Sequence, residues 1–273
     1  MPQVNEDRQG LLKGVRCFLL DLDGTVYLED HWIPGAVDFL NKVEASGRKY
    51  LFLTNNSSRC AEDYVKKFRA MGFPVPGEKI VSSGEVTAVY VQEHFPQKTV
   101  FVLGNESLKK EFTSRGIPLG EEEADVLVTG FDTTLTYRTL TVACSLARRG
   151  VPYVATHPDF NCPVKGGFIP DIGAIEAFIA ASAGRHPDEI LGKPNGGIVD
   201  YALKRAGVAR EETAMVGDRL YTDIPAGVRN GLVSIFVLSG EGTLEELPRY
   251  KEQPHLIFTS VREMIPLLHG EEF

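Results

Sequence analysis

The segment from Cys17 to Tyr27, CFLLDLDGTVY, constrains the fold of this chain more than any other. It begins with four apolar residues, as a buried strand of a parallel sheet does. Two carboxylates, Asp21 and Asp23, follow at once, and Gly24 then allows a tight backbone turn. Because open α/β sheets carry their sites at the carboxyl ends of strands, the segment predicts a site there. Taken alone, the DG pair is equally compatible with an ordinary acidic turn.

Apolar strand segments alternate with helical segments along the whole chain. This alternation predicts an α/β fold, a Rossmann-like doubly wound parallel sheet with helices on both faces. Strands are expected at 17–20, 50–53, 80–81, 100–103, 126–129, 153–155, 214–216 and 232–237, and helices at 36–46, 61–71, 106–115, 136–149, 175–183, 198–206 and 260–268. Residues 157–167 are rich in proline and glycine, so we expect an exposed loop there.

The middle of the chain repeats the alternation over a length of roughly 100 residues, which is enough for a small α/β domain of its own. We therefore predict two domains. Residues 1–84 together with 189–273 form the core domain, and residues 85–188 form a smaller inserted α/β domain.

Composition excludes several classes of partner. No apolar stretch approaches the roughly 20 residues that cross a membrane. The net charge is −8 and no basic run of five residues occurs, so we expect no nucleic-acid partner. The four cysteines are scattered and form no CxxC pair, which argues against a zinc site or a disulfide framework and predicts a reducing, cytoplasmic location.

Four motifs resemble those of the haloacid dehalogenase-like (HAD) hydrolases, in the family's order. The DLDGT segment at 21–25 resembles the first motif, DxDx[TV], and the TNN segment at 54–56 is typical of the NagD/4-nitrophenylphosphatase-type branch. Lys193, within GKP, fits the third motif, and GDRLYTDI at 217–224 fits the fourth. The resemblance covers nearly the whole chain after the N-terminal residues.

The resemblance implies roles for the two acids of the first motif. Asp21 is expected to be the nucleophile, because a carboxylate that attacks a phosphoryl group forms an aspartyl-phosphate and divides one difficult step into two. Asp23 is expected to protonate the leaving oxygen and then to activate water, as a general acid and base does.

The second and third motifs are expected to bind phosphate. By the resemblance, Thr54 and Asn55 hydrogen-bond the phosphoryl group, although TNNSS alone is also typical of a polar helix entry. Lys193 is expected to neutralise the developing phosphoryl charge and to keep Asp21 ionised.

The fourth motif is expected to help bind Mg²⁺. The resemblance implies Asp21, Asp23 and Asp218 as the metal-site residues, since carboxylate oxygens and water suit this ion. Asp223 is expected to orient these ligands or Lys193 without touching the metal.

The inserted domain resembles the C2-type cap of this family, which covers the active site and contacts substrate. His157, Asp159, Asn161 and Lys165 are the candidate substrate contacts, with Arg138 as a weaker one, and each is equally compatible with an ordinary exposed polar group. Caps of this kind often self-associate in relatives, which implies a homodimer formed through the cap.

These expectations combine into a Mg²⁺-dependent hydrolase acting on phosphoric monoesters. The substrate is expected to be a small phosphorylated metabolite of the 4-nitrophenyl phosphate, sugar phosphate or nucleotide type. Dehalogenases of the superfamily lack the second aspartate of the first motif, so Asp23 argues against them. A phosphotransferase or phosphomutase with the same motifs stays open, as does a ligand-binding module without turnover.

Overall fold

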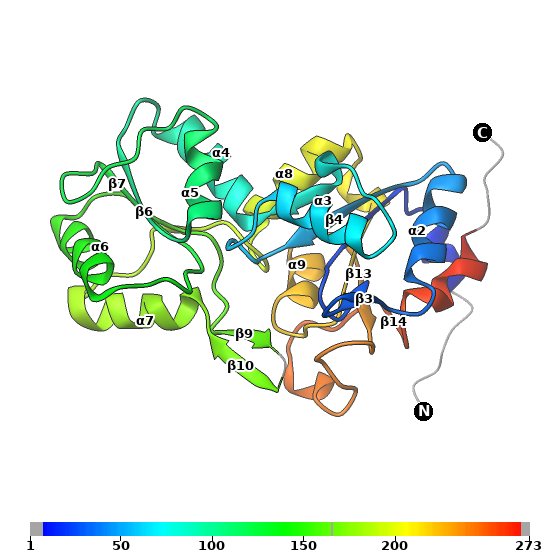
Figure 1. Ribbon diagram of the computed structural model, residues 1–273. Helices are drawn as coiled ribbons and strands as arrows, with labels where there is room; N and C mark the ends of the chain where they lie inside the picture. The colour runs from blue at the N-terminus through cyan, green and yellow to red at the C-terminus, as the bar shows by residue number, and fades with distance from the viewer. Residues whose placement is uncertain (1–7, 165, 269–273) are drawn as a thin grey trace. The chain divides into compact units, whose positions relative to one another are not determined.

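The computed structural model describes residues 8–164 and 166–268. The chain folds into two compact units, drawn in Figure 1. The first unit comprises the described parts of 1–53, 65–81 and 193–273, and the second comprises 54–64 and 82–192. The predicted insertion at 85–188 lies within the second unit, and its boundaries stay a prediction.

A six-stranded sheet forms the centre of the first unit, with the strand order β14-β13-β12-β1-β4-β5. Strand β1 pairs in parallel with both β12 and β4, so their carboxyl ends lie along one edge of the sheet. All four β1 residues are buried, which is why this strand is a continuous apolar run. The six strands are β1 (Cys17–Leu20), β4 (Lys49–Thr54), β5 (Ile80–Ser82), β12 (Thr213–Gly217), β13 (Val233–Val237) and β14 (Leu256–Phe258).

Helices and a short hairpin complete the first unit. Helix α9 (Asp223–Arg229) packs against β12 and β13, and its Ile224 is buried with Leu220 and Phe236. The segment expected as a closing helix at 260–268 is a 3₁₀-helix containing Pro266, which has no N–H to donate to an α-helical bond. The remaining elements are α1 (Arg8–Lys13), the hairpin β2 (Tyr27–Leu28) and β3 (His31–Trp32), α2 (Ala36–Ala45), η1 (Gly77–Lys79), α8 (Gly196–Ala206), η2 (Arg210–Glu212), α9 (Asp223–Arg229), η3 (Leu247–Arg249) and η4 (Val261–Leu267). Helix α3 (Ala61–Ala70) begins in the 54–64 segment and continues into 65–81.

The second unit contains a parallel sheet of its own, with the order β11-β8-β7-β6. Its strands are β6 (Val100–Leu103), β7 (Val126–Thr129), β8 (Tyr153–Ala155) and β11 (Glu189–Ile190), and its helices are α4 (Ser83–His94), α5 (Glu106–Thr113), α6 (Tyr137–Arg149) and α7 (Ile172–Ala183).

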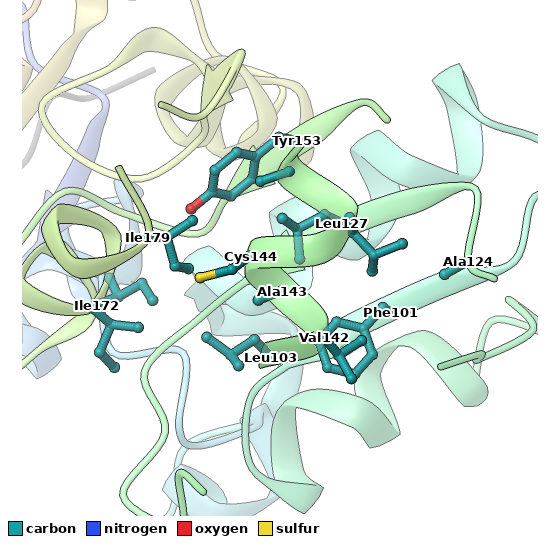
Figure 2. Packing of buried hydrophobic residues seen from close by; sticks show 13 residues of the cluster. Phe101, Leu103, Ala124, Leu127, Val142, Ala143, Cys144, Tyr153, Ile172 and Ile179 are labelled. Atoms are coloured by element: carbon teal, nitrogen blue, oxygen red, sulfur yellow. The ribbon is translucent and has the colours of Figure 1, made fainter. Parts of the chain in front are cut away.

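The core on one face of this second sheet consists of alternate strand residues. Phe101, Leu103, Leu127 and Tyr153 are buried against the apolar side chains of α6 and α7, and Figure 2 shows this cluster. Alternation follows from the pleat, which directs successive side chains to opposite faces. Each buried side chain of this size contributes about 1.5–3 kcal/mol to folding, so the second unit has a substantial core.

A helix and a hairpin are among the elements of the second unit that differ from the sequence-based expectation. Helix α4, which was not predicted, begins after Ser82, whose Oγ accepts a hydrogen bond from the N–H of Glu85 at 3.1 Å. An antiparallel hairpin of β9 (Asn161–Val164) and β10 (Gly167–Pro170) begins within the expected loop at 157–167 and extends beyond it. Most side chains of this hairpin are exposed, so the sequence carries no apolar alternation there.

Among the helices that the structure describes, none has the length and apolar character needed to cross a membrane.

Candidate active site

A tight turn at the end of β1 presents the two acids of the first motif. The N–H of Asp21 donates to the carbonyl of Val216 in β12 at 2.9 Å, which continues the pairing of the two strands. The carbonyl of Leu22 then accepts from three successive N–H groups of residues 25–27. Gly24 has φ +84°, and a Cβ there would lie 2.3 Å from Oδ2 of Asp218, so the turn requires glycine.

Lys193 joins two of the predicted acids inside the first unit. Its side chain is 2 % exposed, and Nζ donates to Oδ1 of Asp21 at 2.5 Å, to Oδ1 of Asp223 at 2.7 Å and to the carbonyl of Leu53 at 3.0 Å. Burial disfavours the ammonium form, but the two carboxylates outweigh burial and the pKa of Lys193 is raised. The lysine is therefore a fixed positive charge beside the expected nucleophile.

The two oxygens of Asp21 differ in their surroundings. Oδ1 accepts from Lys193, whereas Oδ2 receives no hydrogen bond from any residue that the structure describes. The oxygen without a bond is the one suited to attack an electrophile, because the lysine fixes the other.

Asp23 as a residue reaches solvent, but protein atoms surround its carboxyl group, which is bound through one oxygen. Its Oδ2 accepts from the hydroxyl of Tyr27 at 2.9 Å. The pKa of Asp23 is raised because surrounding protein atoms displace water and because Asp21 is close, while the Tyr27 bond and two basic groups oppose the rise. A raised pKa favours the protonated form that a general acid needs.

Three carboxylates of the first unit could hold a cation. One oxygen from each of Asp21, Asp218 and Asp223 lies within 4.8 Å of the others. Burial, and then the charges of the other two acids, raises the pKa of Asp218, so a cation would relieve the crowding of negative charge. Oxygen donors of this kind fit Mg²⁺. The side chain of Asp23 does not belong to this group, and its role at the metal stays a prediction.

The acids of the fourth motif are held in different ways. Asp218 accepts from the Thr25 hydroxyl at 3.1 Å and from the Glu241 N–H at 2.7 Å, so both its oxygens are oriented. Asp223 has both oxygens engaged, one by Lys193 and the other by the N–H of Arg219 at 3.0 Å. This engagement is consistent with the expected role of Asp223 in orienting Lys193.

Thr54 and Asn55 belong to the second unit, so their predicted contact with phosphate stays a prediction. Thr54 is the last residue of β4, and its Oγ1 accepts from the N–H of Asn56 at 3.1 Å. The side-chain amide of Asn55 donates to both carboxylate oxygens of Asp159, at 3.2 Å each. Asp159 is 4 % exposed, so this predicted substrate contact is buried and paired with Asn55.

His157 is completely buried, contrary to its expected place in an exposed loop. Its Nδ1 lies 2.9 Å from the Thr156 hydroxyl, and its Nε2 lies 3.1 Å from Oδ1 of Asp171. Asp171 also caps α7 by accepting from the N–H of Ile172 at 2.6 Å. Burial opposes a charge on the ring, but Asp171 outweighs it and the pKa of His157 is raised. These contacts link the strand end to α7, which is a structural role.

Two other candidates of the inserted domain, Asn161 and Arg138, are exposed. Asn161 is exposed in β9, and Arg138 is exposed on α6, where it pairs with Glu121 and Glu122 at 3.5 Å each. Lys165 lies outside the described residues. A part in substrate recognition stays a prediction for all three.

Comparisons with known proteins agree with the motifs. The model of the haloacid dehalogenase-like hydrolases matches residues 18–118, and a second HAD-hydrolase-like model matches residues 190–264. The acid sugar phosphatase of Staphylococcus aureus strain MRSA252 is 34 % identical over 255 residues, which cover 93 % of this chain and 98 % of that protein.

Two similar solved structures extend this result. A 4-nitrophenylphosphatase from Thermotoga maritima is 47 % identical with a TM-score of 0.92, over 95 % of this chain and 99 % of that one. A structure provisionally named nagD protein is 49 % identical with a TM-score of 0.83, over 88 % and 95 % of the two chains. The predicted family and the α/β fold class are thereby confirmed, and this chain belongs to the haloacid dehalogenase-like hydrolases, in their NagD-like branch.

Proposed function

We propose that this chain is a Mg²⁺-dependent phosphatase that hydrolyses small organic phosphate monoesters through an aspartyl-phosphate at Asp21. The observation that carries the proposal is the buried Lys193, which binds Asp21 and Asp223 at once. A fixed ammonium next to a carboxylate with one unbound oxygen suits attack on an anionic phosphoryl group.

The reaction proceeds in two steps. Oδ2 of Asp21 attacks phosphorus while the ester bond breaks, and Asp23 gives its proton to the departing oxygen. Asp23, now ionised, takes a proton from a water molecule that attacks the aspartyl-phosphate. Inorganic phosphate leaves, Asp21 is regenerated, and Asp23 has recovered its proton. Lys193 attracts the charge that develops on the phosphoryl oxygens.

Asp21 and Asp218 would hold Mg²⁺, with Asp223 close enough to orient them. When bound, the ion supplies electrostatic stabilisation to the phosphoryl oxygens and offsets the repulsion among the acids. The overall charge of −8 makes such local positive charge necessary for binding an anionic substrate.

The names of relatives support a proposal for the class of substrate. The names of two of them are acid sugar phosphatase and 4-nitrophenylphosphatase, so we include sugar phosphates and aryl phosphates among the monoesters that this chain cleaves. We also propose a cytoplasmic location, because the four cysteines are free. We further propose a homodimer, which a measurement of molecular mass in solution tests.

The test is phosphate release from a panel of aryl, sugar and nucleotide monophosphates, with Mg²⁺ and then with a chelator. We expect release that stops on chelation and returns with added Mg²⁺. Asp21→Asn should abolish turnover without unfolding the chain, and substantial residual activity would exclude Asp21 as nucleophile. Transfer of phosphate to an added alcohol or sugar instead of water would identify a phosphotransferase, and no cleavage at all would favour a binding module.

A further inference from the structure

We infer that Tyr27 is a positioning residue for the reaction, because it fixes the Asp23 carboxyl group so that its free oxygen delivers the proton to the leaving group. The inference rests on the proposed phosphatase function. It concerns a residue that lies outside the four motifs and to which no role was assigned above.

The contact between these two residues is direct. The Tyr27 hydroxyl donates to Oδ2 of Asp23 at 2.9 Å. Oδ1 of Asp23 receives no hydrogen bond from any residue that the structure describes. A carboxyl group held by one oxygen has fewer orientations, so the second oxygen is presented in one direction.

The backbone also fixes the two residues relative to each other. Asp23 and Tyr27 form an isolated β-bridge, and the N–H of Gly24 donates to the carbonyl of Tyr27 at 2.8 Å. Tyr27 begins strand β2 and pairs with Trp32 of β3. The hydroxyl therefore comes from the hairpin that directly follows the catalytic turn.

The tyrosine ring itself is held on several sides. It is 1 % exposed, and its centroid lies 6.0 Å from that of Phe68 and 6.5 Å from that of Trp32. The ammonium of Lys67 lies 3.9 Å from the ring centroid, as in a cation–π contact. A buried ring with these neighbours keeps its place when only its hydroxyl is removed, so Tyr27→Phe is a clean substitution.

Tyr50 provides a matched control in the same unit. It is 3 % exposed, and Lys79 lies 3.8 Å from its ring centroid, which repeats the Tyr27–Lys67 arrangement. Tyr50 lies in β4 and has no part in the proposed site. Tyr50→Phe therefore reproduces the loss of a hydroxyl from a buried, cation-capped ring without touching Asp23.

The test compares kcat/KM for two phosphate esters, because this ratio reports the steps up to departure of the leaving group. 4-Nitrophenolate leaves without a proton, whereas an alkoxide must receive one. General acid catalysis is worth about 10²–10⁴-fold. We expect Tyr27→Phe to lose part of the rate acceleration that general acid catalysis provides. Its kcat/KM should fall about 10-fold for an alkyl phosphate and less than about 2-fold for 4-nitrophenyl phosphate. Tyr50→Phe should change neither value, and melting curves should show that both variants are folded at the assay temperature.

A double-mutant cycle distinguishes positioning from a general structural effect. In an Asp23→Asn background, Tyr27→Phe should cause no further loss with the alkyl phosphate, because its effect passes through Asp23. Equal losses for both esters, no loss for either, or full additivity with Asp23→Asn would overturn the inference while leaving the phosphatase function intact. A wild-type protein that cleaves neither ester would instead refute the proposed function itself.

Discussion

Glu176 is a buried acid whose replacement should stabilise the protein only at high pH. It lies on α7, is 8 % exposed, and accepts from the Thr129 hydroxyl at 3.1 Å. Burial raises its pKa from 4.5 to about 7, against the opposing effects of the Thr129 bond and of His157. Glu176→Gln keeps an oxygen for Thr129 but removes the ionisation.

The magnitude follows from linkage between protonation and folding. Below the ordinary pKa the carboxyl group is neutral in both states and has no effect. As pH rises toward 7, the unfolded chain loses the proton more readily than the folded one, so stability falls. Because one pH unit corresponds to about 1.4 kcal/mol, a rise from 4.5 to about 7 costs the wild type about 3 kcal/mol above pH 7.

Urea unfolding at a series of pH values measures this difference. We expect the free energy of unfolding of Glu176→Gln to equal that of the wild type near pH 4.5 and to exceed it by about 3 kcal/mol near pH 9. Circular dichroism follows the loss of the helices on unfolding, including α7, which carries Glu176.

The control is Glu123→Gln, because Glu123 belongs to the same unit and its side chain is 92 % exposed. Its ion pair with Arg149, at 3.5 Å, is exposed, so Glu123→Gln should change the free energy of unfolding by less than about 1 kcal/mol at any pH. The argument from burial would be refuted if Glu176→Gln raised the free energy of unfolding by the same amount at all pH values, or did not raise it near pH 9.

Three further substitutions test contacts within one unit or the other. Gly24→Ala should lower stability by about 1–3 kcal/mol and reduce activity, because Gly24 has φ +84° and a Cβ would strike Asp218; urea unfolding and phosphate release measure both. Lys193→Met should lower kcat by at least about 10²-fold, because the fixed charge beside the nucleophile is lost, and steady-state kinetics with folded protein check this. The raised pKa of His157 stabilises the wild type below about pH 6.5, and this stabilisation is lost as pH rises through that raised pKa. His157→Gln should therefore lower the free energy of unfolding at low pH, and the values for variant and wild type should become equal at high pH. An unchanged kcat in Lys193→Met would contradict the first of these two expectations. A difference in the free energy of unfolding between His157→Gln and the wild type that is the same at every pH would contradict the other.

Strands that are buried on both faces could be predicted from the sequence. Cys17–Leu20 and Val100–Leu103 are uninterrupted apolar runs, Val126–Thr129 is apolar up to its last residue, and the structure has strands with these bounds. Runs of this kind carry their own signal because every side chain is buried. The acids and the lysine of the motifs could also be found, since each follows a strand or precedes a helix. In the structure the side chains of Asp21, Lys193, Asp218 and Asp223 lie close together, and their roles stay a prediction.

Features that depend on distant contacts could not be predicted. The hairpin β9–β10 has exposed strands, so its residues resemble those of a loop. The pairing of His157 with Asp171 joins residues 14 apart in the sequence, and no local pattern marks it. Tyr27 could have been noticed only by its position four residues after Asp23, because the turn that brings its hydroxyl back depends on the hairpin.

The position of β1 at the centre of its sheet has a consequence for synthesis of the chain. One neighbour, β4, leaves the ribosome soon after β1, but the other, β12, comes roughly 200 residues later. Because the chain is synthesised at about 5–20 residues per second, one edge of β1 stays unpaired for about 10–40 s before β12 has been made. An unpaired apolar strand edge can recruit other chains. The nascent protein should therefore need a chaperone during this interval, and it cannot act on phosphate esters until its last third has been made.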